Sequence, residues 1–226
     1  MTDTRLVALL QLADSLFPIG SFAHSDGLEH AVAVGRVTNA GELRRWLDAQ
    51  LAGPLATADG RGVSLAHTHW RASCLAELDE LDDEMHALRP SSASRDAARA
   101  MGTRLLKTWT AARPDFDVSA YLVRRASRGV TLPVAFGIAC GSAAIAPAPA
   151  VEAFLYTRLA GSISAAMRLM KIGQSEAQRV LAEMLEQVPA VGAAIVAADS
   201  RPAVFAPALD IAAMSQQYQR SRLFRS

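Results

Sequence analysis

Residues 9–29 read LLQLADSLFPIGSFAHSDGLE, an apolar run with helical spacing that is interrupted and then starts again. Its leucines recur at spacings of three and four, the period of an amphipathic helix. Pro18 and Gly20 would end that helix, because proline lacks a backbone donor and glycine suits a turn. Ser25 can cap a second helix, with Glu29 near the positive end of the helix dipole. The stretch therefore predicts a helix, a break and another helix.

The same period recurs along most of the chain, and the alternating pattern of strands is not evident. Asn39 and Glu42 fit a capping box at the start of a helix that Gly53 and Pro54 would end. Ser175 would cap another helix later in the chain. Because the connections between these segments are short, we predict an all-α fold, a single-domain helical bundle of about ten helices.

The composition agrees with a helical fold and argues against several functional classes. Of the 226 residues, 51% are hydrophobic and only 6% are aromatic, so the apolar mass is mostly Ala, Leu and Val. The net charge of +1 offers no basic field for nucleic acid. Cys74 and Cys140 give no disulfide framework and suit a reducing compartment. Because the N-terminal run is amphipathic and does not resemble a signal peptide, we expect a cytoplasmic protein.

Residues 129–151 carry no charge and are numerous enough to cross a membrane. Pro133, Pro147 and Pro149 bracket a short, alanine-rich apolar run, and glycines dilute it. These features favour a buried core helix with Pro133 in its first turn, and we expect no membrane contact. A membrane-associated helical protein is the alternative.

No residue pattern identifies a metal site or a catalytic centre. His67 and His69 are two residues apart, which on a helix turns them about 200° from each other, so they cannot bind one ion together. The phosphate-binding pattern G-x-x-x-x-G-K-[ST] is absent. Ser21, His24 and Asp26 lie close in sequence, but working triads combine separated segments with an oxyanion hole. We predict no catalytic, cofactor-binding or metal-binding residue; the alternative is a small helical hydrolase that uses His24 and nearby polar residues.

Six acidic residues lie between Glu77 and Glu84. A helix through this segment places Leu78, Leu81 and Met85 on its opposite face. We interpret the acidic side as the solvated face of an amphipathic helix, and an electrostatic docking face is the alternative.

The chain ends with YQRSRLFRS (residues 218–226), where three arginines surround two large apolar side chains. Arginine and aromatic residues are frequent anchors at protein interfaces, although a frayed end also fits this position. We divide the chain into a helical domain, residues 1–215, and a C-terminal partner-docking tail, residues 216–226. The candidate partner-binding residues are Tyr218, Arg220, Arg222, Leu223, Phe224 and Arg225.

Five stretches of the sequence resemble the urease accessory protein UreF family, and they occur in the order of that family over nearly the whole chain. They comprise residues 9–29, 94–106, 132–137, 154–156 with 164–169 and 172–181, and 221–226. The resemblance implies that certain residues shape two turns. These structural motif residues are Pro18, Gly20, Phe22, Ser25, Gly27 and Glu29 in the N-terminal turn, and Gly173 and Gln174 in the turn before Ser175.

The resemblance also implies a function. The family is all-α and dimeric, and its members are non-enzymatic chaperones or scaffolds for urease maturation. Such a protein bridges UreD, called UreH in some systems, and the GTPase UreG, so that nickel is inserted into the active site of apo-urease. No cofactor is then expected on this chain, because nickel is handled by the complex and GTP is bound by UreG. The C-terminal tail would become ordered on binding UreD/UreH, and the homodimer would present a surface to UreG.

This sequence departs from the family pattern at two places. Many members carry a His-Glu pair upstream of the terminal Arg-Leu-Phe-Arg-Ser, where this chain has Ser215, Gln216 and Gln217. Many also have a histidine before the Pro-Val-x-Phe-Gly segment, where this chain has Thr131. These departures weaken a role for a histidine there in handling nickel, and they leave the scaffold interpretation intact.

Overall fold

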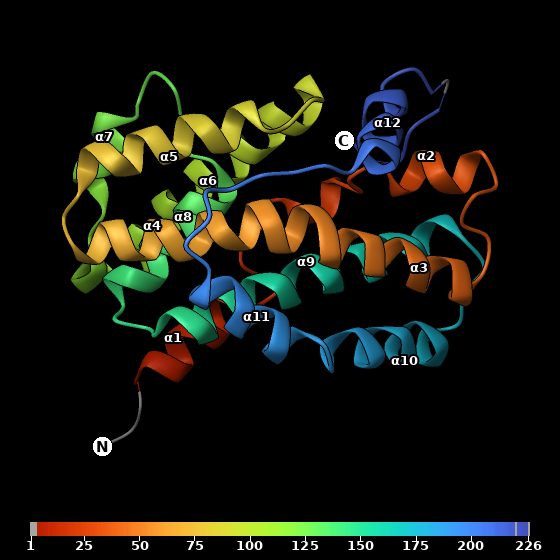
Figure 1. Cartoon of the computed structure of the whole chain (residues 1–226), viewed down its shortest axis with the longest axis horizontal. Helices are drawn as coiled ribbons and strands as arrows, with labels where there is room; N and C mark the ends of the chain where they lie inside the picture. The colour runs from red at the N-terminus through yellow and green to blue at the C-terminus, as the bar shows by residue number, and fades with distance from the viewer. Residues whose placement is uncertain (1–3, 220, 226) are drawn as a thin grey trace.

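The computed structural model describes residues 4–219 and 221–225, and it is helical with no strand in these ranges (Figure 1). The α-helices in chain order are α1 (Thr4–Ala13), α2 (Leu28–Ala33), α3 (Ala40–Gln50), α4 (Arg61–Arg71), α5 (Leu75–Ala87), α6 (Ser92–Ala112), α7 (Ser119–Arg124), α8 (Leu132–Ser142), α9 (Pro147–Leu169), α10 (Gln174–Leu185), α11 (Val188–Ala197) and α12 (Pro207–Gln216). Two short 3-10 helices, η1 and η3, and a π-helical segment, η2, cover Ser21–Ala23, Pro114–Phe116 and Leu51–Gly60. The predicted all-α fold is confirmed.

Helix α8 forms the centre of the core, and its residues from Leu132 to Gly141 are all buried. It packs mainly against α4 and α6. Gly137 lets α4 approach closely, because a Cβ at this position would lie 2.4 Å from the carbonyl oxygen of Val63. An apolar helix without a polar face is stable only where neighbouring elements cover all its sides. The prediction of a buried core helix with Pro133 in its first turn is confirmed.

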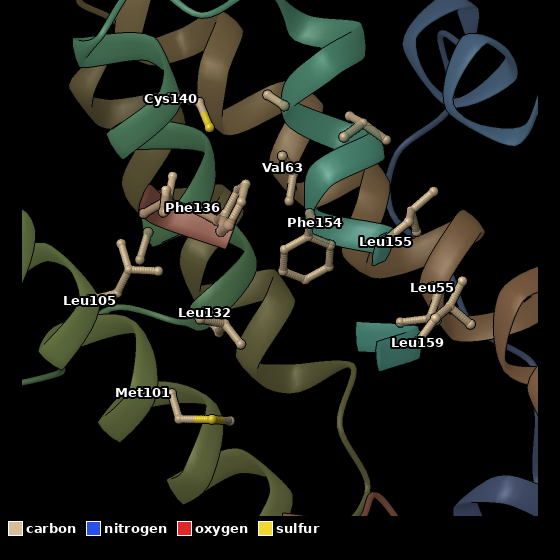
Figure 2. Packing of buried hydrophobic residues seen from close by; sticks show 14 of the residues in the cluster. Leu55, Val63, Met101, Leu105, Leu132, Phe136, Cys140, Phe154, Leu155 and Leu159 are labelled. Carbon is tan, nitrogen blue, oxygen red and sulfur yellow. The ribbon is translucent and has the colours of Figure 1, made fainter. Parts of the chain in front are cut away.

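The 23-residue helix α9 runs across the molecule and contacts α1, α2, α4, α8, α10 and α11 (Figure 1). Figure 2 shows its Phe154 beside Phe136 of α8, and the two ring centroids lie 5.4 Å apart at an interplanar angle of 72°. Edge-to-face aromatic pairs of this kind add to the free energy gained by burying the rings. Buried hydrophobic residues from α1 to α11, together with Phe224 of the tail, form one continuous cluster.

The segment Gln174–Ala197 has the length and apolar composition of a membrane-spanning helix. In the structure it is divided into α10 and α11 with a break after Leu185, and both helices pack against α9. Core helices of globular proteins meet the same criterion of length and composition, so this segment is weak evidence for a membrane span.

The prediction for the third helix is correct at its start and wrong at its end. Asn39 caps α3, because its side-chain oxygen accepts a hydrogen bond from the backbone nitrogen of Glu42 at 3.0 Å. Gly53 and Pro54 do not end the helical path, since η2 continues α3 into α4. The non-helical backbone of Gly53 (φ −95°, ψ −114°) supplies a kink that accommodates the proline ring. The sequence rule failed because a π-helical segment can absorb the break.

The acidic helix α5 is not simply solvated, contrary to our interpretation of its sequence. Asp82 is fully buried and accepts hydrogen bonds from the backbone nitrogen and Oγ1 of Thr131 at 2.8 and 2.6 Å. It also forms an ion pair with the buried Arg125 at 2.7 Å, and Arg125 contacts Asp83 at the same distance. Burial raises the pKa of the Asp82 carboxyl, whereas the bonds from Thr131 and Arg125 lower it. The cluster joins α5 to the residue after α7 and to the start of α8.

Candidate partner-binding site

The N-terminal break contains two left-handed turns. Gly20 (φ +82°) precedes η1, and Gly27 (φ +86°) precedes α2. Pro18 lies in the bend that follows α1. Gly27 also permits close packing, because a Cβ there would lie 2.7 Å from the backbone nitrogen of Ala213 in α12. The absence of a side chain at Gly27 therefore lets the start of α2 lie directly against α12.

Ser25 does not hold the N-cap position of α2, contrary to the prediction. Gly27 occupies that position, and its left-handed backbone delays the helix until Leu28. The buried hydroxyl of Ser25 donates to Oε1 of Gln216 at 3.0 Å and accepts from the backbone nitrogen of Glu29 at 3.4 Å. Ser25 therefore joins the first turn of α2 to the end of α12.

The carboxylate of Glu29 is the point at which the C-terminal tail meets α2. Its oxygens accept hydrogen bonds from the backbone nitrogens of Leu223 and Phe224 at 2.5 and 3.2 Å, and from Nε2 of Gln216 at 3.2 Å. The side chain is buried, so a charged acceptor of this kind requires such donors to offset its lost hydration. The sequence predicted that Glu29 stabilises the start of a helix through the helix dipole. The structure shows that Glu29 also binds the tail.

Phe224 is buried and connects the tail to α9. The guanidinium carbon of Arg168 lies 4.4 Å from the centre of its ring, a cation–π distance, and Nη1 of Arg168 donates to the carbonyl oxygen of Phe22 at 3.0 Å. The backbone nitrogen of Arg225, whose side chain is exposed, donates to the carbonyl oxygen of Ala23 at 2.8 Å. The described tail residues are thus held by contacts within the chain. The resemblance implied instead that the tail becomes ordered on binding UreD/UreH.

Several large apolar side chains of these segments remain accessible. Phe22, Tyr218 and Leu223 are 67%, 82% and 53% exposed, and we refer to them together as the tail surface. Arg222 is exposed as well, and Arg220 lies outside the described residues. Exposed aromatic and leucine side chains on an anchored backbone are suitable contacts for a protein partner.

The second predicted turn lies between α9 and α10. Gly173 is the N-cap residue of α10, and Gln174 is the first residue of that helix. The prediction that Ser175 caps this helix is wrong, because α10 begins two residues earlier than such a cap would place it, and its N-cap makes no side-chain hydrogen bond.

His24 lies next to the tail in a positively charged environment. Burial lowers the pKa of its imidazole, the nearby Asp26 raises it, and Arg158, Arg225 and Arg104 lower it further. Asp26, the acid that a triad with His24 would need, forms an ion pair with Arg158. The electrostatics of this position therefore favour a neutral histidine beside a paired carboxylate.

Within the residues that the structure describes, no group of three or more histidine, cysteine, aspartate or glutamate side chains is arranged to hold a metal ion. His67 is buried in α4, where its Nε2 lies 2.8 Å from the carbonyl oxygen of Ile145, and burial lowers its pKa. Cys140 is buried in α8, and burial raises the pKa of its thiol. These two side chains belong to the core.

The comparisons with known proteins agree on one family. The family model described as UreF matches residues 37–185. The chain belongs to the UreF family. The urease accessory protein UreF of Methylibium petroleiphilum is 33% identical over 224 residues, which cover 98% of this chain and 94% of that protein. The UreF proteins of an Azoarcus species and of Paenarthrobacter aurescens are 34% and 31% identical, over 98% and 100% of this chain and 95% and 100% of their own lengths.

The UreF match and the site overlap only in part. The family model leaves out both the N-terminal turns and the tail, whereas the alignment with the Paenarthrobacter relative includes them. Sequence patterns mark both segments, but they do not mark Arg168 as a contact of the tail, and Gln216 stands out only as a departure from the family pattern. A buried glutamine near the end of a helix gives no local signal of its partner, because that partner lies 187 residues away at Glu29.

Proposed function

We propose that this chain takes part in urease maturation as a non-catalytic scaffold. It bridges UreD/UreH and the GTPase UreG as a homodimer in the cytoplasm, so that nickel is inserted into apo-urease. The observation that carries the proposal is its similarity over the full length to proteins named urease accessory protein UreF. Nickel is the cargo of the complex in this proposal and GTP belongs to UreG, so the chain itself requires no cofactor.

The tail surface supports the assignment of one partner. Its three side chains are exposed, whereas the backbone that carries Leu223 is held by the Glu29 carboxylate. A pre-ordered backbone reduces the entropy that binding would otherwise cost. We assign this surface to UreD/UreH.

The maturation role is tested in cells that express urease and all its accessory genes, with and without the gene for this chain. Urease activity and nickel content per active site are the readouts. We expect both to fall together when the gene is absent and to return when it is restored. Urease that is fully loaded with nickel in its absence would refute the proposed function.

The partner assignment is tested by Tyr218→Ala combined with Leu223→Ala. We expect binding to UreD/UreH to weaken at least about tenfold, because truncation of interface anchors typically costs more than 1 kcal/mol each. Isothermal titration calorimetry measures the affinity, and Val123→Ala is the control, since Val123 is 76% exposed on α7. Unchanged affinity in the double variant would show that the tail surface is not the UreD/UreH site. Phe224→Ala is less informative, because this buried ring stabilises the chain itself.

A further inference from the structure

Three arginines from different parts of the chain meet at the N-terminal turn, and each contacts a backbone carbonyl oxygen of residues 19–23. Nη1 of Arg104 in α6 donates to one of them at 3.4 Å, and Nη1 of Arg168 in α9 donates to another at 3.0 Å. The backbone nitrogen of Arg225 in the tail donates to a third at 2.8 Å. All three side chains are exposed, and we refer to them together as the arginine cluster.

The positive charge of this region acts on the imidazole of His24. Burial is the first cause of its lowered pKa, and the nearby Asp26 opposes that effect. The charges of Arg158, Arg225 and Arg104 lower the pKa further. Guanidiniums from α9, the tail and α6 therefore produce one common positive field over the turn.

The two carboxylates at this turn are already engaged. Asp26 forms an ion pair with Arg158. Glu29 is buried and accepts hydrogen bonds from the backbone nitrogens of Leu223 and Phe224. Neither carboxylate is therefore available to neutralise the arginine cluster.

Within the residues that the structure describes, no member of the arginine cluster forms an ion pair with a carboxylate. A guanidinium carries several N–H donors in a planar fork that suits the two oxygens of a carboxylate. The side chain of Arg104 makes one long hydrogen bond, and that of Arg168 makes one hydrogen bond and the cation–π contact with Phe224. Most donors of the cluster are thus left for water or for a partner.

The arginine cluster borders the tail surface. Arg168 is bonded to the backbone of Phe22, and Arg225 follows Leu223 by two residues. A partner that covers Phe22 and Leu223 must also displace water from the neighbouring guanidiniums. Removing water from a charge without pairing it is unfavourable, so such a partner has to supply carboxylates at the same place.

We propose that the arginine cluster binds an acidic segment of the protein that covers the tail surface. Carboxylates of this segment pair with Arg104, Arg168 and Arg225, while its apolar side chains contact Phe22 and Leu223. The whole chain has a net charge of only +1, which favours a local contact with a protein over binding along a nucleic acid. The inference rests on the proposed function where it takes UreD/UreH as this partner.

The test measures how the affinity for UreD/UreH depends on charge and on salt. Isothermal titration calorimetry is carried out with the full-length chain in about 50 mM and about 300 mM sodium chloride, because salt screens exposed charges. The variant is Arg104→Gln combined with Arg225→Gln. The matched control is Arg45→Gln combined with Arg179→Gln, which removes the same charge from side chains that are 74% and 67% exposed on α3 and α10.

We expect the affinity of the unaltered chain to fall at least about tenfold from the lower to the higher salt concentration. In the lower salt concentration, the variant should bind at least about tenfold more weakly than the unaltered chain, and its affinity should depend less on salt. The control pair should stay within about twofold of the unaltered chain. Arg104→Lys combined with Arg225→Lys keeps the charge and should retain the salt dependence, which separates a lost charge from a disturbed fold.

Two results would overturn the inference and leave the proposed function in place. One is an affinity of the unaltered chain that does not respond to salt. The other is a loss of affinity in the variant no larger than that in the control pair. If the unaltered chain does not bind UreD/UreH at either salt concentration, the partner assignment itself is wrong, and the inference fails with it.

Discussion

At Gly27 a left-handed backbone (φ +86°) coincides with a close neighbour, since a Cβ there would lie 2.7 Å from the backbone nitrogen of Ala213. We predict that Gly27→Ala lowers the free energy of unfolding by about 2–4 kcal/mol, because left-handed strain adds to a clash that α12 must move to relieve. The control is Gly35→Ala, which has φ +75° but no atom within 4 Å of the added Cβ. Urea denaturation measures both losses, and equal values would contradict the close approach of α12.

Buried histidines should make the fold less stable in mild acid. Burial lowers the pKa of His67 in the folded chain below 6.5, its ordinary value. As the pH falls from 6.5 to the lower folded value, the unfolded chain takes up a proton that the folded chain does not, so the free energy of unfolding decreases through this window. We predict that His67→Gln reduces this loss by up to about 1.4 kcal/mol per pH unit.

The measurement compares urea denaturation at pH 7.5 and 5.5. His69→Gln is the control, because His69 lies on the same helix and is only half-buried. A pH dependence in His67→Gln equal to that of the unaltered chain would show that His67 does not contribute to acid sensitivity.

Among the elements, the cluster around Asp82 connects three helices through one carboxylate. We predict that Asp82→Ala lowers the free energy of unfolding by about 3–5 kcal/mol, since it leaves the guanidinium of Arg125 buried with less compensating charge. Asp83→Ala is the matched control, because Asp83 contacts the same Arg125 but is 40% exposed. We expect Asp83→Ala to lower the free energy of unfolding by about 1 kcal/mol or less. Chemical denaturation of both variants provides the comparison. Equal losses would mean that burial of Asp82 adds nothing to the ion pair.

The elements also show which structural features the sequence can predict. Helices such as α8 were predicted correctly, because apolar spacing and a proline in the first turn are local signals. The continuation through Pro54 was missed, since the kink at Gly53 preserves a helical path that the sequence rule treats as ended. The interpretation of α5 as a solvated acidic face failed at Asp82, because Arg125, the partner of Asp82, lies 43 residues away. Local rules therefore succeed for helix formation and fail where a distant residue decides the outcome.

At the scale of the whole molecule, the separation of residues along the sequence again decides which parts of the site could be predicted. Each end of the chain carries a recognisable pattern, and the resemblance to UreF selected both. The contacts of Glu29 with Leu223 and Phe224 join residues 194 and 195 positions apart, so no periodicity or capping rule could predict them. They require the complete fold, because α9 and α12 must first bring the two ends together.

The continuous core also predicts how the whole molecule unfolds. Trp46 lies on α3, Trp70 on α4 and Trp109 on α6, and all three belong to or pack against the same hydrophobic cluster. We predict that variants with only one of these tryptophans, the others being replaced by phenylalanine, report coincident urea transitions by fluorescence. A single cluster that links these helices leaves no subdomain able to unfold alone, so each tryptophan should record the same cooperative event. A separate midpoint for Trp46 would instead place α3 in an independent unit and contradict the single-domain fold.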